Sequence, residues 1–124
     1  ALLADTARAA GLDALVEVHA DEELETAVAV GADVIGVNAR NLRTFALDRG
    51  AFARLRPQFP DGVVAVAESG IAVPADVHEA AADGADAVLV GEALVRAADP
   101  GRQVAGLVAA GKDRVPESPL RRSR

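Results

Sequence analysis

The stretch Ala67-Glu68-Ser69-Gly70-Ile71 decides how the rest of the chain is interpreted. It follows the apolar run Val63-Val64-Ala65-Val66 and precedes Pro74-Ala75-Asp76, which is typical of the start of a helix. The sequence therefore predicts a strand, a turn and a helix in that order. Glu68 falls at the carboxyl end of the strand, and the Ser-Gly pair leaves backbone N–H groups free to face a ligand.

A second turn of the same kind lies further along the chain. Val88-Leu89-Val90 is a short apolar run that leads into Gly91-Glu92, with Gly91 placed 21 residues after Gly70. Two such turns after neighbouring parallel strands are a common arrangement for binding one phosphate group. The sequence therefore predicts a phosphate site whose backbone donors belong to Ser69, Gly70, Gly91 and Glu92.

Strands and helices are expected to alternate over residues 1–111. The apolar runs predict strands at 14–19, 34–38, 63–66 and 87–90, and the apolar spacing predicts helices at 2–11, 21–30, 49–58, 75–83, 92–97 and 100–111. Asp21 is the expected N-cap of the second helix, and Glu22 and Glu23 fall in its first turn, where the helix dipole favours acids. A Gly-Ala-Asp triplet precedes the second strand and again the fourth. This alternation favours an α/β fold with a parallel sheet.

Four β-α units fit either a small doubly wound domain or one half of a (β/α)8 barrel. Polar residues at the carboxyl ends of several strands, Glu17, Asn38 and Glu68, favour the half barrel, because that end of a barrel holds the active site. The phosphate-type turns after the last two strands and a start inside a helix favour it too. A Rossmann domain is disfavoured, because no Gly-x-Gly-x-x-Gly follows the first strand. We expect the C-terminal half of a (β/α)8 TIM barrel over 1–111.

Composition excludes several classes of partner. The 124-residue chain carries a net charge of −6, which disfavours nucleic acid and anionic membranes. It has no cysteine and only two histidines, so we expect no thiolate or other transition-metal site and no cofactor. No apolar run reaches the roughly 18 residues of a membrane span, and we expect a cytoplasmic protein. Residues 112–124, with two prolines and several charges, predict a disordered tail.

Four motifs occur in order along the chain. They are Leu15-Val16-Glu17-Val18-His19, Gly36-Val37-Asn38-Ala39-Arg40-Asn41-Leu42, Ala67-Glu68-Ser69-Gly70-Ile71 and Val90-Gly91-Glu92-Ala93-Leu94. Singly they are weak, because the last two are found in other phosphate-binding barrels. Together, at this spacing, they resemble indole-3-glycerol phosphate synthase from its fifth strand to its end, and the Asn-Ala-Arg-Asn-Leu form resembles actinobacterial members. The resemblance covers nearly all of residues 1–111.

The resemblance implies a carbon–carbon lyase of tryptophan biosynthesis. Members of that family close an indole ring on 1-(2-carboxyphenylamino)-1-deoxyribulose 5-phosphate and release CO2 and water. By resemblance Glu17 is the catalytic base and Asn38 a second catalytic residue. By the same resemblance, the substrate is contacted by Arg40, Glu68 and Leu89. Its phosphate is contacted by Ser69, Gly70, Gly91 and Glu92. Ala93 stands where many relatives carry a hydroxyl, which leaves only backbone contacts there.

The chemistry of these residue types agrees with such roles. Asn38 offers both a donor and an acceptor, and the planar fork of Arg40 suits a carboxylate. Glu68 is expected to point inward, to contact substrate or to pair with Arg40. The structural alternatives are a salt bridge for Glu17, loop stabilisation for Asn38 and Arg40, and turn glycines without a ligand. His19 is a weaker candidate, since a hydrogen-bonded histidine at a strand end explains it equally well.

The resemblance also implies what the chain does not contain. The active-site lysines and a further glutamate of the family lie on strands of its first half, whereas the single lysine here is Lys112. We therefore expect an incomplete synthase, inactive or nearly so alone, whose first and fourth strands are open edges. Those edges would pair with a missing N-terminal half or with another copy. Two alternatives stay open: part of another phosphate-binding barrel such as a phosphoribosyl isomerase, and a self-associating half barrel that binds phosphate esters without chemistry.

Overall fold

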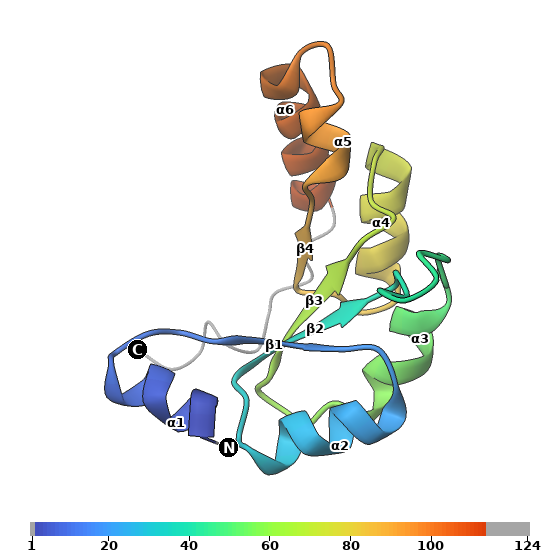
Figure 1. The fold of residues 1–124 in the computed structure, drawn as a ribbon. Helices are drawn as coiled ribbons and strands as arrows, with labels where there is room; N and C mark the ends of the chain where they lie inside the picture. The colour runs from blue at the N-terminus through green and yellow to red at the C-terminus, as the bar shows by residue number, and fades with distance from the viewer. Residues whose placement is uncertain (1, 114–124) are drawn as a thin grey trace.

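The computed structural model describes residues 2–113 as four strands that alternate with helices (Figure 1). The strands are β1 (Leu15–Val18), β2 (Val34–Asn38), β3 (Val64–Glu68) and β4 (Ala87–Leu89). The helices are α1 (Leu2–Ala9), α2 (Asp21–Ala29), α3 (Ala51–Leu55), the 3-10 helix η1 (Arg56–Gln58), α4 (Pro74–Ala82), α5 (Glu92–Val95) and α6 (Pro100–Lys112).

The sheet has the order β1-β2-β3-β4, and every neighbouring pair is parallel. Each strand therefore pairs with the next along the chain, through a connection that contains a helix. This is the order expected for consecutive units of a (β/α)8 barrel, and it confirms the predicted half-barrel arrangement. Within the described residues, β1 and β4 are the two edges of the sheet.

The hydrophobic core lies between one face of the sheet and the helices. Side chains alternate along a strand, so Val18, Ile35, Val37, Ala65 and Ala67 share this face, and all are buried. They pack in one cluster with residues of α2, α3 and α4, including Leu24, Phe52, Leu55 and Ala80. Figure 1 shows these three helices along the same side of the sheet. A second, smaller cluster joins α4 to α6 through Val77, Leu107 and Ala110.

The opposite face of the sheet is much more open. It carries Leu15, Glu17, Asn38 and Leu89, and Leu15 and Leu89 are 43% and 50% exposed. Parallel sheets are ordinarily covered on both faces, and in a closed barrel this face is the packed interior. The apolar runs in the sequence predict burial on both faces, and within the described residues only the helix-covered face is fully buried.

The repeated Gly-Ala-Asp triplet has a structural reason. Gly31 and Gly84 follow α2 and α4 with φ of +69° and +92°, the left-handed conformation that commonly ends a helix. The aspartate of the second triplet, Asp86, then accepts a hydrogen bond from the backbone N–H of Ala65 at 2.9 Å. The triplet therefore ends a helix and starts the next strand in register.

One helix start and one helix length differ from expectation. The N-cap of α2 is Ala20, and Asp21 is the first helical residue, whose carboxylate accepts from Gln58 at 2.6 Å. The helix predicted over 49–58 is shorter, because Pro57 lacks an N–H and its ring clashes with the preceding turn, which changes α3 into η1 at Arg56. Asp99 caps α6, accepting from the N–H of Arg102 at 2.9 Å.

The described part of the chain ends just beyond α6. This helix continues through Lys112, and the rest of the predicted tail, 114–124, lies outside the described residues. Over residues 2–113 no helix is both long and apolar enough to cross a bilayer.

A matched pair of substitutions tests where the core lies. Leu55 on α3 is fully buried against the sheet, whereas Leu3 on α1 is 84% exposed. We expect Leu55→Ala to lower the free energy of unfolding by about 2–5 kcal/mol through lost burial and a cavity, and Leu3→Ala to change it by less than about 0.5 kcal/mol. Urea denaturation followed by circular dichroism measures both, and equal losses would place the core elsewhere.

Candidate active site

The carboxyl ends of β1, β2 and β3 bring three of the predicted site residues into one cluster. Asn38 pairs in register with Glu68, and Glu17 pairs with Gly36, two residues before Asn38 on the same face. The Asn38 amide Nδ2 donates to Glu17 Oε1 at 3.2 Å. Glu17, Asn38 and Glu68, predicted separately from three strand ends, therefore line the open face at one end of the sheet.

Asn38 is held in one orientation by its neighbours. Its side-chain oxygen Oδ1 accepts from the Ser69 hydroxyl at 2.7 Å and from the backbone N–H of Arg40 at 2.9 Å. With Oδ1 occupied by two donors, the amide nitrogen must point the other way, toward Glu17. The Ser69 contact also ties the second strand end to the turn that follows the third.

Glu68 is the one buried charged residue of the described chain, at 4% exposure. Its carboxyl folds back over Gly36, where a Cβ would overlap Glu68 Oε1. That oxygen is buried and has no hydrogen-bond partner among the described residues. Burial, and then the Glu17 carboxyl beside it, raise the pKa of Glu68 to about 7. Near neutral pH this group can therefore either hold or release a proton.

His19 and Glu23 extend the cluster outward from Glu17. His19 Nε2 lies 3.3 Å from Glu17 Oε1, and His19 Nδ1 lies 3.2 Å from Glu23 Oε2. Glu23 also accepts from the backbone N–H of His19 at 2.6 Å. This backbone hydrogen bond and the His19 ring lower the pKa of the Glu23 carboxyl. Glu23 lies in the first turn of α2 as expected, and it also anchors the residue that follows β1.

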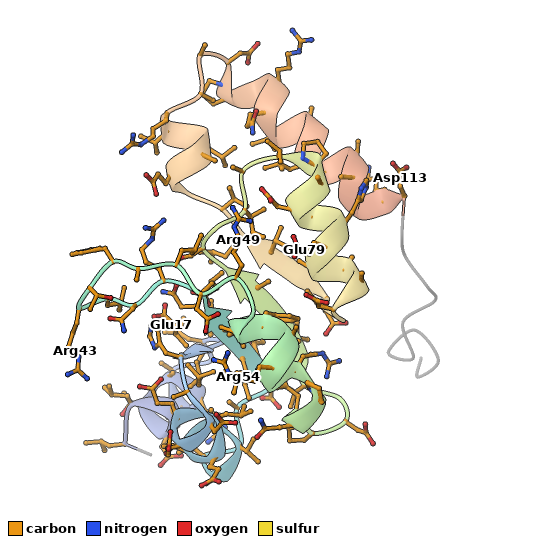
Figure 2. The ribbon with its side chains drawn as sticks, turned by 90° about the vertical axis from the view of Figure 1, so that its right-hand side faces the viewer. Glu17, Arg43, Arg49, Arg54, Glu79 and Asp113 are labelled. Carbon is orange, nitrogen blue, oxygen red and sulfur yellow. The ribbon has the colours of Figure 1, made fainter. Side chains whose placement is uncertain are left out.

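Arg40 does not pair with Glu68, which corrects one of the expectations for these residues. Its guanidinium contacts Glu92 Oε2 at 3.3 Å and donates to the backbone carbonyl of Phe45 at 3.3 Å. Arg40 therefore joins the loop after β2 to the first residue of α5. The loop continues to Arg43, which extends from its outer tip away from Glu17 (Figure 2).

The two predicted phosphate turns follow neighbouring strands, as expected. Ser69 and Gly70 both have left-handed backbones, with φ of +66° and +75°. Such a conformation is unfavourable for serine and is common at ligand-binding turns. Leu47 packs 3.2 Å from where a Cβ on Gly70 would lie, so this turn has no room for a side chain.

Backbone donors are available at both turns. Within residues 2–113, the N–H groups of Ser69, Gly70, Gly91 and Glu92 are paired with no protein acceptor. Gly91 is the N-cap of the short helix α5, which begins at Glu92. The arrangement matches the barrel phosphate site formed by the last two strand ends and a short extra helix.

Leu89 lies on the same open face, half exposed beside the cluster, where it supplies apolar surface. The described residues contain no group of three or more potential metal ligands.

Two residues of this site are difficult to find in the sequence. Gly36 reads as an ordinary strand glycine, and its role depends on the neighbouring strand that places Glu68 over it. Glu23 reads as a first-turn acid, and its role depends on the angle at which α2 leaves β1. The sequence hints at the His19–Glu23 contact only through their four-residue spacing. That spacing brings side chains together within one helix, whereas here it spans the junction between β1 and α2.

The raised pKa of Glu68 predicts a pH-dependent stability. The folded chain keeps this proton up to about pH 7, whereas an unfolded chain loses it near the ordinary value of 4.5. Between these values the folded state binds more protons, so stability falls as the pH rises through this window and is then constant. Glu68→Gln cannot titrate. Its stability relative to the unsubstituted chain should therefore rise between pH 4 and 8, by an amount of the order of 2 kcal/mol. A pH-independent difference in urea midpoints would contradict the assignment.

Gly36→Ala tests the packing that buries Glu68. The added methyl group displaces the end of a flexible side chain rather than backbone, so the stability near pH 7 should change by less than about 1 kcal/mol. The displaced carboxyl should gain water, and its pKa should fall toward the ordinary value. Carbon-13 NMR titration of Glu68 in both proteins measures this, and an unchanged titration would show that Gly36 does not control the position of Glu68.

Comparison with known proteins gives a consistent family. The family model described as indole-3-glycerol phosphate synthase matches residues 1–107. "Indole-3-glycerol phosphate synthase 1" of Streptomyces coelicolor is 54% identical over 110 residues, which cover 89% of this chain and 41% of that protein. The indole-3-glycerol phosphate synthase of Kineococcus radiotolerans is 56% identical over 109 residues, covering 88% and 40%. The chain thus spans about 40% of the length of these curated relatives.

Solved structures support the fold. The structure described as native KDPGal aligns with a TM-score of 0.73 at 18% identity, covering 90% of this chain and 53% of that one. The Amycolatopsis orientalis BexX/CysO complex aligns with a TM-score of 0.63 at 29% identity, covering 93% and 51%. The four β-α units therefore correspond to about half of a larger α/β chain. Taken with the family match over nearly its whole described length, this chain belongs to the indole-3-glycerol phosphate synthase family.

Proposed function

We propose that this chain supplies the C-terminal half of an indole-3-glycerol phosphate synthase active site. The reaction is the decarboxylating ring closure of 1-(2-carboxyphenylamino)-1-deoxyribulose 5-phosphate to indole-3-glycerol phosphate, CO2 and water. The observation that carries the proposal is the Glu17–Asn38–Glu68 cluster, placed beside two turns with unpaired backbone N–H groups. Two carboxyl groups suited to acid–base chemistry and the Asn38 amide thus lie near two turns whose N–H groups could bind a phosphate. A cytoplasmic location remains a prediction of the sequence.

In this proposal Glu17 is the base and Asn38 orients it. The 3.2 Å bond from Asn38 holds one carboxylate oxygen, so that the base is placed before substrate arrives. Glu68, with a pKa near 7, is suited to exchange a proton with substrate oxygens at neutral pH. Leu89 provides apolar surface for the aromatic ring.

The charged ends of the substrate have separate binding groups. The phosphate binds the backbone donors at Ser69, Gly70, Gly91 and Glu92, where a left-handed turn and a helix start meet. Arg40 binds the substrate carboxylate through its planar fork. Glu92 occupies that fork in this structure, at 3.3 Å and on the surface, so the exchange costs little.

The chain alone lacks part of this site. Its single lysine, Lys112, is the last residue of α6, and the chain has no other lysine to act as the general acid. The open face and the unpaired edges of β1 and β4 are where a complementary half barrel would pack. We therefore propose that activity requires an N-terminal half.

The open edges also favour a second reading, in which two copies associate and bind phosphate esters without chemistry. The same edges would then pair between copies, and Glu17 would have no role in turnover. The family match disfavours the other alternative, that the chain is part of a different phosphate-binding barrel such as a phosphoribosyl isomerase.

Complementation tests the proposal. The purified chain is given the carboxyphenylamino-deoxyribulose phosphate, alone and mixed with the N-terminal portion of the Streptomyces coelicolor relative, and indole fluorescence is followed. We expect no indole fluorescence from the chain alone and turnover in the mixture. Glu17→Gln should reduce the turnover at least 100-fold because the base is lost, whereas Glu25→Gln, an exposed glutamate of α2, should leave it unchanged.

Other outcomes would count against the proposal. Turnover by the chain alone would show that no lysine is needed. Normal turnover by Glu17→Gln would show that Glu17 is not the base. A stable dimer by gel filtration that binds an inert phosphate ester, with no turnover in any mixture, would favour the non-catalytic reading.

A further inference from the structure

A short chain of polar contacts runs from the surface of α2 to the catalytic carboxylate of the proposed site. Glu23 contacts one ring nitrogen of His19, and the other ring nitrogen faces Glu17 Oε1. Glu23 is about half exposed, the His19 ring is about one-third exposed, and its Nε2 atom is buried. The resemblance to the family assigns no role to either His19 or Glu23.

The outer end of this series of contacts, at Glu23, is firmly held. One oxygen of Glu23 accepts from the backbone N–H of His19, at 2.6 Å, and lies 3.2 Å from the ring atom Nδ1. Because the same carboxylate binds the backbone and the ring of one residue, the ring has little freedom to rotate. Its other nitrogen is thereby aimed at Glu17.

The inner end is nearly, but not fully, formed. Nε2 lies 3.3 Å from Glu17 Oε1, yet the two atoms form no hydrogen bond, and the buried nitrogen has no other partner among the described residues. The imidazolium form of His19 carries an N–H on both ring nitrogens. In that form a small shift of the Glu17 carboxylate completes the contact with Nε2 and removes the cost of a buried nitrogen without a hydrogen bond. Catalytic hydrogen bonds are often long in a structure without substrate and tighten when it binds.

Glu17 Oε1 is held from the other side by Asn38. The Asn38 amide donates to the same oxygen at 3.2 Å, and its orientation is set by Ser69 and Arg40. His19 and Asn38, from the ends of β1 and β2, therefore flank one oxygen of the carboxylate. Neither of them uses the second oxygen.

We propose that His19 is a positioning residue, whose ring, anchored by Glu23, holds Oε1 of Glu17 against Asn38 and so fixes the direction in which the carboxylate meets the substrate. This inference rests on the proposed function, in which Glu17 is the base. Fixing a base in advance lowers the barrier of the chemical step and changes substrate binding little.

Two isosteric substitutions separate this role from a merely structural one. In His19→Gln the amide nitrogen lies where Nε2 was and still reaches Glu17. In His19→Asn the amide nitrogen lies where Nδ1 was, so it reaches Glu23 and not Glu17. Both side chains are polar and similar in size, so a role limited to the end of β1 would affect them alike.

In the complemented enzyme we expect His19→Gln to keep kcat within about threefold, and His19→Asn to lower it about tenfold with KM unchanged. His78→Asn, on α4, serves as the control and should behave like the unsubstituted chain. Equal kcat values for the Gln and Asn variants would overturn the proposal.

A spectroscopic measurement on the 124-residue chain decides the question independently of activity. The side-chain amide resonances of Asn38 report on Glu17, and we expect them to shift in His19→Asn but to stay in place in His19→Gln. Unchanged Asn38 resonances in His19→Asn would overturn the inference. Loss of turnover in every mixture, with the expected shifts present, would reject the proposed function and leave the His19 contact established.

Discussion

Parallel pairing in register is the constraint on which the rest of this structure depends. Because β1, β2 and β3 run in the same direction without slippage, their carboxyl ends meet at one edge of the sheet, and Asn38 comes opposite Glu68. A shift of one residue would turn Glu17, Asn38 and Glu68 into the helix-covered core, and would turn Ile35 and Val37 out of it. The hydrophobic core and the polar cluster are therefore fixed by the same register.

Gly36 connects this backbone constraint to the electrostatics of the site. Its missing side chain leaves the space into which the Glu68 carboxyl folds, away from water and beside Glu17. Two carboxyl groups so placed do not both ionise easily, and a proton is retained to near neutral pH. Burying the Glu68 carboxyl lowers the stability of the fold, and apolar packing on the helix-covered face of the sheet offsets this loss.

The two faces of the sheet differ in how well the described residues cover them. One face has its helices, and the other presents Leu15, Leu89 and the polar cluster with little cover. The turns after β3 and β4 are formed by their own strand ends and α5, all within the described residues. The single lysine of the sequence, Lys112, lies at the end of α6. In the proposed reaction this chain would therefore supply the phosphate donors, and an N-terminal half would supply the general acid.

The sequence by itself determined the alternation of strands and helices, the turns that follow β3 and β4, and the strand-end positions of Glu17, Asn38 and Glu68. These are local patterns, carried by apolar runs, glycines and the order of motifs along the chain. Only the tertiary structure decided that Arg40 pairs with Glu92 rather than Glu68, that Glu68 lies over Gly36, and that Glu23 anchors His19. Those contacts join residues of different strands or depend on the angle between a strand and a helix. Such geometry is set by packing of the whole sheet and leaves no periodic signal in the chain.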